Sequence, residues 1–439
     1  MPKNDSNNYV IRVLDSPLAI DGAAWNTLLA LQAHPTPFMR HEYLAALHTS
    51  GCAVEATGWT TRFMTLWQDG QLAAACPLYL KTHSHGEYVF DWAWANAYQQ
   101  HGLTYYPKAL VAVPFTPVPG TRLLARDAAA RDALVQALIG WCTQESLSSL
   151  HLLFAADEDL AACTRAGLMQ RDTVQFHWTN QTPTTLAKAS QNLTPTSATS
   201  TASHPFGSFD HFLASLSQEK RKKIRQERRK VAEAGVSFRW ARGSDISATD
   251  WDFFYRCYER TYLEHGNAPY LSRGFFQQMA QAMPENWLLF IGERAGRPMA
   301  SSLIALHDHS TLGTGQNHSK SGPHTARGPD SAPEEAETVA YGRYWGALER
   351  VDCLHFEACY YQPLQWCIEH GVKRFEGGAQ GEHKMARALL PVKTSSAHWL
   401  AHPAFADAVE RFLEREGQGI GDYLAHLEAR SPLRKPTGG

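Results

Sequence analysis

The chain has 439 residues, more than one hydrophobic core usually serves, so we expect two domains. Hydrophobic residues make up 44% of it and charged residues 19%, which excludes a globally disordered protein. The formal net charge of -2 excludes a whole-protein field directed at nucleic acid or an anionic membrane, so any such contact needs a local patch.

The cysteines and the N-terminus carry no sign of secretion or metal binding. The eight cysteines are scattered, and none forms a C-x-x-C pair, so neither a zinc ribbon nor a disulfide framework is indicated. The N-terminus lacks the apolar core of a signal peptide, and no apolar run is long enough to span a bilayer. We therefore expect a cytoplasmic protein with no metal and no membrane span. The oligomeric state is left open.

Residues 9–178 alternate short apolar runs with helical patterns, which is typical of a layered α/β domain. The runs at 63–67 and 71–80 predict a hairpin. Residues 123–141 predict a helix, and 149–154 predict the buried strand that follows it.

The densest segment of this first part is 83–94. His83, His85 and Glu87 would share one face of an extended strand, a pattern open to a metal site or to polar side chains that line a groove. No second ligand cluster accompanies them, which favours the groove. Asp91 stands between two aromatic residues, and it is either held for hydrogen bonding or for a raised pKa, or it is buried and satisfied in an ordinary way.

Two stretches of low-complexity composition divide the chain. Residues 179–207 are rich in Thr, Ser, Ala, Asn and Pro and predict a flexible linker. Residues 309–337 predict a disordered hairpin insertion within a second domain at 208–430, because lengthening a surface loop costs little entropy.

The second domain carries one strong charge run, 219–230, with eight basic and two acidic residues. Ile224 and Val231 fall on one stripe with Leu213 and Leu216, which predicts a helix docked by a thin apolar seam and cationic around most of its circumference. The run is either a solvated face or a surface that attracts phosphates of a nucleotide-linked substrate, a cofactor or RNA. Lys222 and Arg225 represent this surface.

Residues 341–396 hold a crowded set of polar groups. The pattern predicts a strand at 341–348, a helix at 359–370 that stops at Gly371, and a strand at 372–375 that runs into a Gly-rich turn. These polar groups are too many for a plain core. We interpret the region as a binding site formed by Arg343, Tyr344, His355, Glu357, Tyr361, Gln362, Glu376, Gln380, Glu382, His383, Lys384 and Arg387.

The order of elements in the second domain, with the phrase YYQPLQWCIEHGVKRFEGGAQGEHK at 360–384, resembles the acyltransferases of the GNAT superfamily. More narrowly, the chain resembles the bacterial Fem-like group of peptidoglycan biosynthesis or recognition. Further segments carry this resemblance, namely 81–94, 105–108, 114–117, 175–178, 220–229, 342–346 and 354–357.

The resemblance implies an α/β protein with two GNAT-like domains in tandem, each a mixed central sheet flanked by helices. It implies an N-acyltransferase that moves an acetyl or aminoacyl group to an amine, with a peptidoglycan precursor among the expected acceptors. The donor would be acetyl-CoA, another acyl-CoA or aminoacyl-tRNA. The sequence departs from the family pattern at Ala388, where glycine is usual, and it lacks the GNAT pyrophosphate signature within 349–358.

Acyl transfer to an amine needs a base, donors for the developing oxyanion, and a hold on the donor's phosphates. In the superfamily two splayed central strands expose backbone N–H groups to the acyl carbonyl, and 341–348 is the candidate strand here. The N-terminus of the predicted helix near Cys359 is a candidate anion site.

As the catalytic base we rank Glu357 first, His355 second and Glu376 third, with Tyr361 as a candidate acid. The structural alternatives are a helix cap for Glu357 and core packing for the histidine and the tyrosine. The residues expected to bind substrate or cofactor are Arg343, Tyr344, Gln362, Gln380, His383, Lys384, Arg387, Lys222 and Arg225.

Two other functions stay open at this point. One is non-enzymatic binding of a glycan or peptide, and the other is RNA binding centred on 219–230.

Overall fold

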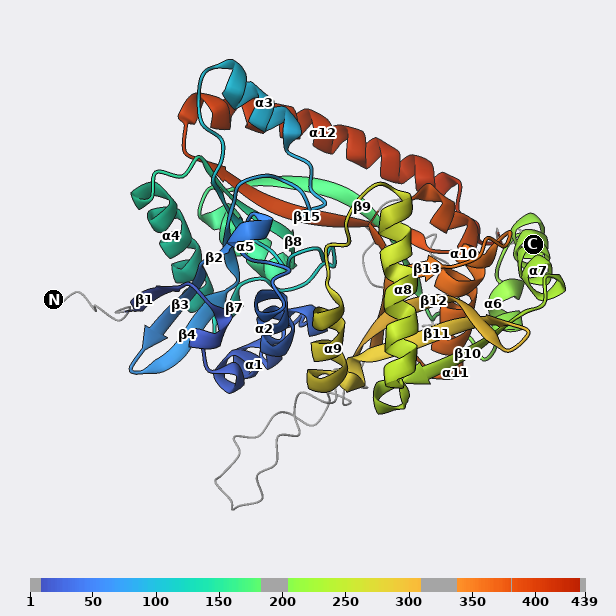
Figure 1. Ribbon diagram of the computed structural model, residues 1–439. Coiled ribbons are helices and arrows are strands. Elements are labelled where there is room, and N and C mark those ends of the chain that lie inside the picture. Colours follow the sequence, from blue (N-terminus) through green and yellow to red (C-terminus); the bar gives the residue numbers. More distant parts are fainter. Residues whose placement is uncertain (1–8, 183–203, 309–337, 380, 435–439) are drawn as a thin grey trace, which may run out of the picture.

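The computed structural model describes residues 9–182, 204–308, 338–379 and 381–434 (Figure 1). Most of the predicted linker and the whole predicted insertion lie outside these residues. We call 9–182 the first half and 204–434 the second half. The structure confirms the α/β class, because helices flank a 4-stranded sheet and an 11-stranded mixed sheet.

The first half follows the alternation of strands and helices that its sequence predicts. Its elements are β1 (Val10–Leu14), α1 (Gly22–Ala30), α2 (His41–Thr49), β2 (Trp59–Thr61), β3 (Phe63–Gln68), β4 (Gln71–Cys76), β5 (Leu78–Lys81), α3 (Trp92–Gln100), β6 (Lys108–Val111), β7 (Leu124–Ala125), α4 (Ala128–Gln144), β8 (Ser149–Ala155), α5 (Asp157–Arg165) and β9 (Met169–Thr179).

The second half contains the longest of the described helices, α12. Its elements are α6 (Phe209–Ala214), α7 (Gln218–Glu233), β10 (Val236–Arg242), α8 (Ala248–Glu264), α9 (Arg273–Ala282), β11 (Trp287–Arg294), β12 (Arg297–Asp308), β13 (Thr338–Ala347), α10 (Leu354–Phe356), α11 (Gln362–Glu369), β14 (Arg374–Ala379), β15 (Leu390–Leu400) and α12 (Pro403–Ala429).

Local sequence explains where these elements begin and turn. The predicted hairpin forms as β3 and β4, joined by Asp69 and Gly70, which both have positive φ as a tight two-residue turn requires. The predicted second strand of this hairpin is divided, because Pro77 separates β4 from β5. Helix α4 begins after Asp127, whose carboxylate accepts a hydrogen bond from the backbone N–H of Ala130 at 2.8 Å.

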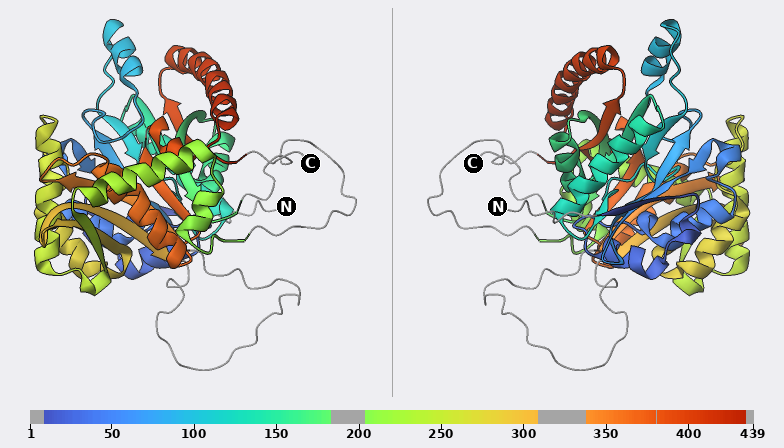
Figure 2. Two further views of the ribbon diagram at one scale, coloured as in Figure 1. Left: turned by 90° about the vertical axis from the view of Figure 1, so that its right-hand side faces the viewer. Right: turned by 90° about the vertical axis from the view of Figure 1, so that its left-hand side faces the viewer.

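One sheet runs through both halves. Its strand order is β10-β11-β12-β13-β14-β9-β15-β8-β6-β5-β2. Strand β15 comes from the C-terminal part of the chain, yet it lies between β8 and β9 of the first half and pairs antiparallel with both. Helix α12 then runs along this junction over both halves (Figure 1). It packs beside α3, which stands out from the same side of the molecule (Figure 2).

The buried core also spans the two halves. Trp25 and Phe63 from the first half belong to the same apolar cluster as Phe254 and Phe275 from the second. The division into domains at 9–178 and 208–430 stays a prediction, and the halves meet through a shared sheet and a shared core. None of the described helices is long and apolar enough to cross a membrane.

Candidate functional site

Strands β13 and β14 lie parallel at the centre of the second half and then part. Their register runs from Val339 opposite Arg374 to Tyr341 opposite Glu376, where it ends, although β13 continues to Ala347 and β14 to Ala379. Beyond the last pair, neither strand has a ladder partner on the facing edge among the residues that the structure describes. The parting that the resemblance implies for 341–348 is therefore present.

A β-bulge marks the same point on β13. Gly342 lies opposite Ile304 and Tyr344 opposite Leu303, so Arg343 is the extra residue of the bulge. A side chain on residue 342 would place its Cβ 3.1 Å from the ring of Phe375, so glycine allows that ring to pack closely against β13 at this point.

Lys384 lies at the parting on the β14 side. It belongs to a single 3-10 helix, Glu382–Arg387, and its Nζ donates to the carbonyl of Gly378 at 2.8 Å. Burial lowers the pKa of this ammonium group to about 8. A buried cation next to unpaired strand edges is suited to a developing negative charge.

His355 packs among aromatic rings near the same point. Its ring centroid lies 4.9 Å from that of Trp345 and 5.7 Å from that of Tyr360. Burial lowers the pKa of His355 to about 4, so its imidazole is neutral near pH 7. His383 is exposed, and its Nε2 lies 3.3 Å from the hydroxyl of Tyr360. Gln380 lies outside the described residues.

Glu376 occupies the last paired position of β14 and is 4% exposed. Its Oε1 accepts from Arg374 Nε at 3.1 Å, while Oε2 is buried without a hydrogen-bond partner and lies 3.8 Å from His177 Nε2. Burial raises the pKa of Glu376 to about 7, with Arg374 acting in the opposite direction.

Glu376 and His177 line a cavity of about 960 Å³ between the two halves. Its wall includes Thr36 and Ser395, and Tyr341 contributes from β13. The third-ranked base of the sequence analysis therefore faces an open space. The sequence analysis did not select His177 as a site residue, because its partner Glu376 on β14 is distant in sequence.

Glu357, ranked first as the base, is held by an ion pair. Arg228 of α7 approaches it with Nη2 to Oε1 at 3.0 Å and with Nε to Oε2 at 3.2 Å. Gln362 Nε2 also donates to Oε1 at 2.7 Å. The carboxylate thus joins α7 to the helix that carries it. The role of Glu357 as a base and the role of Gln362 in binding stay predictions. Neither residue lines the two cavities described in this subsection.

The helix that bears Glu357 begins earlier than predicted. Helix α10, a π-helical turn at Glu357–Tyr361 and α11 form one continuous helix from Leu354. The interpretations of Cys359 as near a helix N-terminus and of Glu357 as a cap are therefore wrong. Burial also raises the pKa of the Cys359 thiol, which argues against a nucleophilic role.

Tyr361 and Arg387 meet a buried acid that the sequence analysis missed. Glu227 of α7 is 8% exposed, and Arg387 Nη2 lies 3.0 Å from its Oε2. The hydroxyl of Tyr361 donates to the same oxygen. Arg387 also stacks on the ring of Phe356, 3.4 Å from its centroid. Both predicted site residues are engaged inside the protein. The signal for Glu227 was its position, since it shares the buried stripe of α7.

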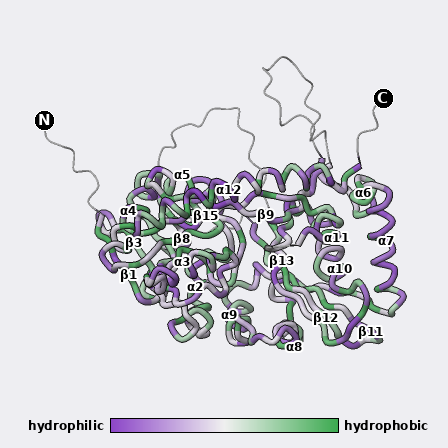
Figure 3. The backbone as a smooth tube through the Cα atoms, turned by 90° about the horizontal axis from the view of Figure 1, so that it is seen from above, coloured by the Kyte–Doolittle hydropathy of each residue, from purple (hydrophilic) through white to green (hydrophobic). Residues whose placement is uncertain are grey.

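The cationic face of α7 is present as predicted. Figure 3 shows α7 as hydrophilic along its length, and its buried positions are Ile224, Glu227 and Val231. Lys222 and Arg225 are exposed, with Arg225 3.3 Å from Asp210. The residues Leu213 and Leu216 do not continue this stripe, because α6 ends at Ala214 and α7 begins at Gln218. A smaller cavity of about 320 Å³ beside α7 is lined by Lys220, Glu382, His383, Met385, Ala386, Arg430 and Pro432.

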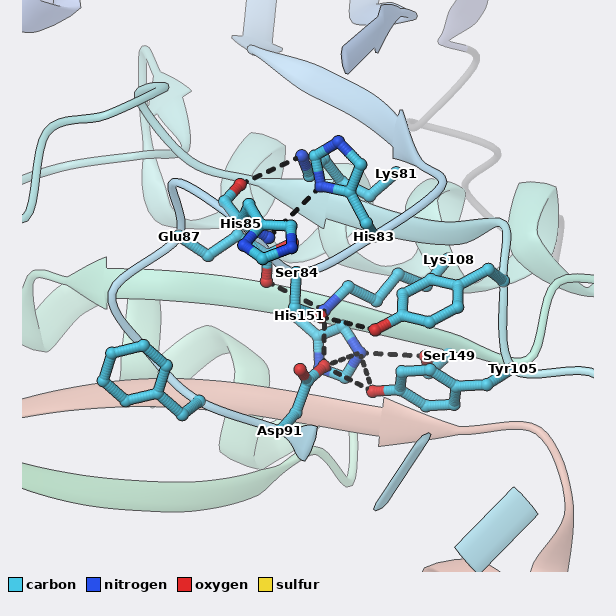
Figure 4. Close-up of polar contacts among 12 residues, drawn as sticks. Lys81, His83, Ser84, His85, Glu87, Asp91, Tyr105, Lys108, Ser149 and His151 are labelled. Carbon is cyan, nitrogen blue, oxygen red and sulfur yellow. Dashed lines mark hydrogen bonds and ion pairs between the residues drawn. The ribbon is translucent and has the colours of Figure 1, made fainter. Parts of the chain in front are cut away.

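The segment 83–94 covers a buried charge network in the first half (Figure 4). Lys108 Nζ donates to Glu87 Oε2 and to Ser84 Oγ, each at 2.8 Å, and to Asp91. Asp91 also accepts from the Tyr105 hydroxyl at 2.6 Å. Burial acts to raise the pKa of Asp91, but the charges of Lys108 and His151 and the hydrogen bonds of the carboxylate together outweigh it and hold that pKa low, so the raised pKa considered for Asp91 is wrong. Burial raises the pKa of Glu87 to about 7. Sequence analysis singled out both acids but not Lys108.

The network continues into the second half through His151. Its Nε2 lies 3.1 Å from the Tyr105 hydroxyl and its Nδ1 lies 2.8 Å from Nδ1 of His398 on β15. The rings of His83 and His85 lie near each other at a tilt of 59°, with centroids 5.1 Å apart. No group of three or more His, Cys, Asp or Glu side chains in the described part of the chain is placed to hold a metal ion.

Comparison with known proteins gives the family. The model of the FemAB-like family, described as peptidoglycan biosynthesis/recognition, matches residues 16–314 and 335–435. The chain belongs to this family. None of the curated proteins matches it.

Three solved structures are similar to this chain at low sequence identity. FemX is 9% identical with a TM-score of 0.48, covering 89% of this chain and 98% of its own. L-PGS from Bacillus licheniformis is 11% identical with a TM-score of 0.44, covering 87% and 98%. A tandem GNAT protein from the clavulanic acid biosynthesis pathway is 12% identical with a TM-score of 0.41, covering 90% and 99%. At these values the likenesses add nothing on activity.

Proposed function

We propose that this FemAB-like protein is an acyltransferase that moves an acyl or aminoacyl group from an activated donor to an amine. The observation that carries the proposal is the parting of β13 and β14 directly beside Glu376, with Arg343 in a bulge on the opposite strand. The parting offers unpaired backbone groups to an acyl carbonyl, and the adjacent carboxylate offers a base.

The chemistry needs no covalent intermediate on the protein. Glu376 removes a proton from the acceptor amine, and the amine nitrogen attacks the carbonyl carbon of the donor. Backbone N–H groups on the facing edge of β13 stabilise the oxyanion. When the carbon–sulfur or carbon–oxygen bond to the leaving group breaks, the Lys384 ammonium supplies the proton that the leaving group requires, which its pKa of about 8 favours. Holding the reactants side by side supplies much of the remaining rate.

The donor binds through its phosphates on the second half. The cationic face of α7 and the smaller cavity lined by Lys220, His383 and Arg430 form one basic region near the 3-10 helix that carries Lys384. Such a region suits the phosphates of acetyl-CoA, of another acyl-CoA or of aminoacyl-tRNA. A peptidoglycan precursor is the acceptor that the family description favours.

The same basic face is the observation that favours the second candidate function, RNA binding without transfer. In that case RNA would bind with strong salt dependence and no product would form.

A transfer assay separates the two. The protein is incubated with labelled acetyl-CoA or with labelled aminoacyl-tRNA, together with a panel of amine acceptors that includes a peptidoglycan precursor, and products are identified by mass spectrometry. A labelled amide product supports the transferase. RNA binding with no amide product from any donor would replace the transferase with the second candidate.

A further inference from the structure

Arg343 is a cation without an acid partner at the centre of the molecule. Within the described residues its hydrogen bonds use Nη2, which donates to the carbonyl of Phe115 at 3.0 Å, to Thr116 Oγ1 at 3.3 Å and to the Tyr344 hydroxyl at 3.1 Å. Nε is buried with no partner, and no carboxylate among the described residues forms an ion pair with the guanidinium.

Arg343 lacks the acid partner that two buried cations of the chain have. Lys108 has Glu87 at 2.8 Å and Arg387 has Glu227 at 3.0 Å. A guanidinium removed from water is costly unless an anion compensates it. Contacts with neutral groups, such as the rings of Phe38 and Tyr344 at 5.0 and 4.9 Å, compensate it only in part.

Hydroxyl groups from both halves surround this cation. Tyr43 from α2 bonds to Thr116, and Tyr344 bonds to Arg343 itself. Tyr88 and Tyr262 lie close enough that their side chains and Arg343 affect one another electrostatically. Phenol hydroxyls donate hydrogen bonds to carboxylate oxygens, so these side chains complement a guanidinium in binding a small anion.

The neighbourhood is also reachable and is held in place. Tyr270 is 37% exposed and stacks on Phe115, whose carbonyl binds Arg343, with ring centroids 4.8 Å apart. The backbone N–H of Phe115 donates to the carbonyl of Gly86 at 3.2 Å. Gly86 lies between Ser84 and Glu87, which both bind Lys108 Nζ at 2.8 Å (Figure 4), so this network anchors the segment that carries Tyr88.

We propose that Arg343 and the surrounding tyrosines form a carboxylate-binding site between the two halves. A carboxylate fits better than a phosphate dianion, because Arg343 brings a single positive charge into an aromatic setting. The assignment of the bound carboxylate to the acceptor rests on the proposed function. Since Arg343 is the bulge residue at the parting, the site would hold an acceptor that carries a free carboxylate near its reacting amine, as an amino acid or peptide does.

The test measures binding without turnover, so it is independent of the transferase proposal. Thermal unfolding of the full chain is followed in N-acetylglycine and in N-acetylglycinamide at equal ionic strength. We expect the acid to raise the midpoint with concentration and the amide to leave it unchanged. In Arg343→Met the apparent Kd for the acid should rise by roughly tenfold or more, and Arg343→Lys should retain part of the effect, because it keeps the charge without the planar fork.

Arg297→Met, which removes an exposed cation in the turn between β11 and β12, is the matched control and should keep the wild-type response. Equal shifts from acid and amide would overturn the proposal. So would an unchanged response in Arg343→Met, or a larger shift from inorganic phosphate than from the carboxylate. If Arg343→Met fails to fold, the acid–amide comparison on the wild-type protein and the lysine variant still decide. Amide product formation from amines that lack a carboxylate, at equal efficiency, would overturn this inference alone.

Discussion

Glu376 combines burial with access to a cavity, and its protonation is the feature most easily measured. A base must be ionised to act, so the rate of transfer should rise as pH increases through about 7. Glu376→Gln should lower kcat/KM by roughly 10²–10⁴-fold, the usual contribution of a general base. Steady-state kinetics between pH 5.5 and 8.5 check both. Glu357→Gln is the comparison, because its acid is already bound by Arg228, and it should retain most of the turnover.

Glu376→Gln, which should lower activity, should raise the stability of the fold at alkaline pH. The pKa of Glu376 is raised from 4.5 to about 7 by burial, so between these values the folded protein binds a proton that the unfolded chain releases. Stability therefore falls as pH rises through this window. Glu376→Gln removes that loss, and at pH 8 it should be more stable than wild type by up to about 3 kcal/mol. At pH 4 the two should match. Urea unfolding at both pH values measures this, and a variant less stable at pH 8 would contradict it.

Lys108 is the residue whose loss should cost the most stability. Lys108→Met leaves Glu87 and Asp91 buried near each other without a counter-charge, and removing one partner of a buried pair costs about 3–5 kcal/mol. The loss should be larger at pH 8 than at pH 5, because protonation relieves the two acids. Denaturant unfolding checks the value. The triple variant with Glu87→Gln and Asp91→Asn is the control, and it should recover most of the loss.

At the residue level the sequence indicated where polar groups gather but not which of them pair. It placed Glu376 and Lys384 correctly in one region, since both lie near the parting. It did not indicate that Arg228 binds Glu357, because the two are separated by more than a hundred residues and no local pattern links them. Glu227 was missed for the same reason, because its partners Tyr361 and Arg387 are also more than a hundred residues away.

The exposed positive charges of helix α7 should contribute to donor binding. Lys222→Glu with Lys223→Glu reverses two exposed charges that have no acid partner within the described chain. We expect donor affinity to fall by roughly tenfold at low salt, with a smaller salt dependence of the remaining binding. The unfolding midpoint should stay unchanged, because exposed charges contribute little to folding.

Titration of donor binding at several salt concentrations measures this effect. Arg297→Glu, an exposed charge reversal away from α7, serves as the control and should bind the donor normally. Equal affinity in the α7 variant would mean that this face is only solvated.

Strands and capped helices followed their patterns, but one helix was placed too late. Pro363 sits inside the continuous helix that begins at Leu354. A proline lacks the backbone N–H and usually marks a helix start. Here the π-helical turn at Glu357–Tyr361 comes directly before it, and such a turn accommodates a missing helical bond. Sequence periodicity contains no signal for that change of pitch.

At the scale of the molecule, the alternation of strands and helices predicted the class, while the path of β15 was beyond prediction. The sequence analysis predicted no strand at Leu390–Leu400. Only the fold shows that these residues pair with β8 and β9, more than two hundred residues earlier. Long-range pairing leaves no local trace, because each strand needs only one apolar face wherever it lies.

The shared sheet leads to a test of the whole chain. A fragment of residues 1–190 should fail to form a stable monomer, because β8 and β9 would both lack β15. Expressed together with residues 191–439, it should copurify as a folded complex, which size-exclusion chromatography and circular dichroism would detect. A partner fragment that ends at residue 388 should not bind it. A monomeric 1–190 fragment with cooperative unfolding would contradict this prediction and support independent domains.

The position of β15 also bears on how the polypeptide matures on the ribosome. The edges of β8 and β9 emerge long before the strand that fills the space between them. At about 5–20 residues per second, roughly ten to forty seconds separate their synthesis from that of β15. Throughout that interval the nascent chain exposes two strand edges whose backbone N–H and C=O groups are unpaired. Slower decoding of the second half would lengthen the delay, so yield of the native protein should depend on translation speed and on chaperones that shield the unfinished sheet.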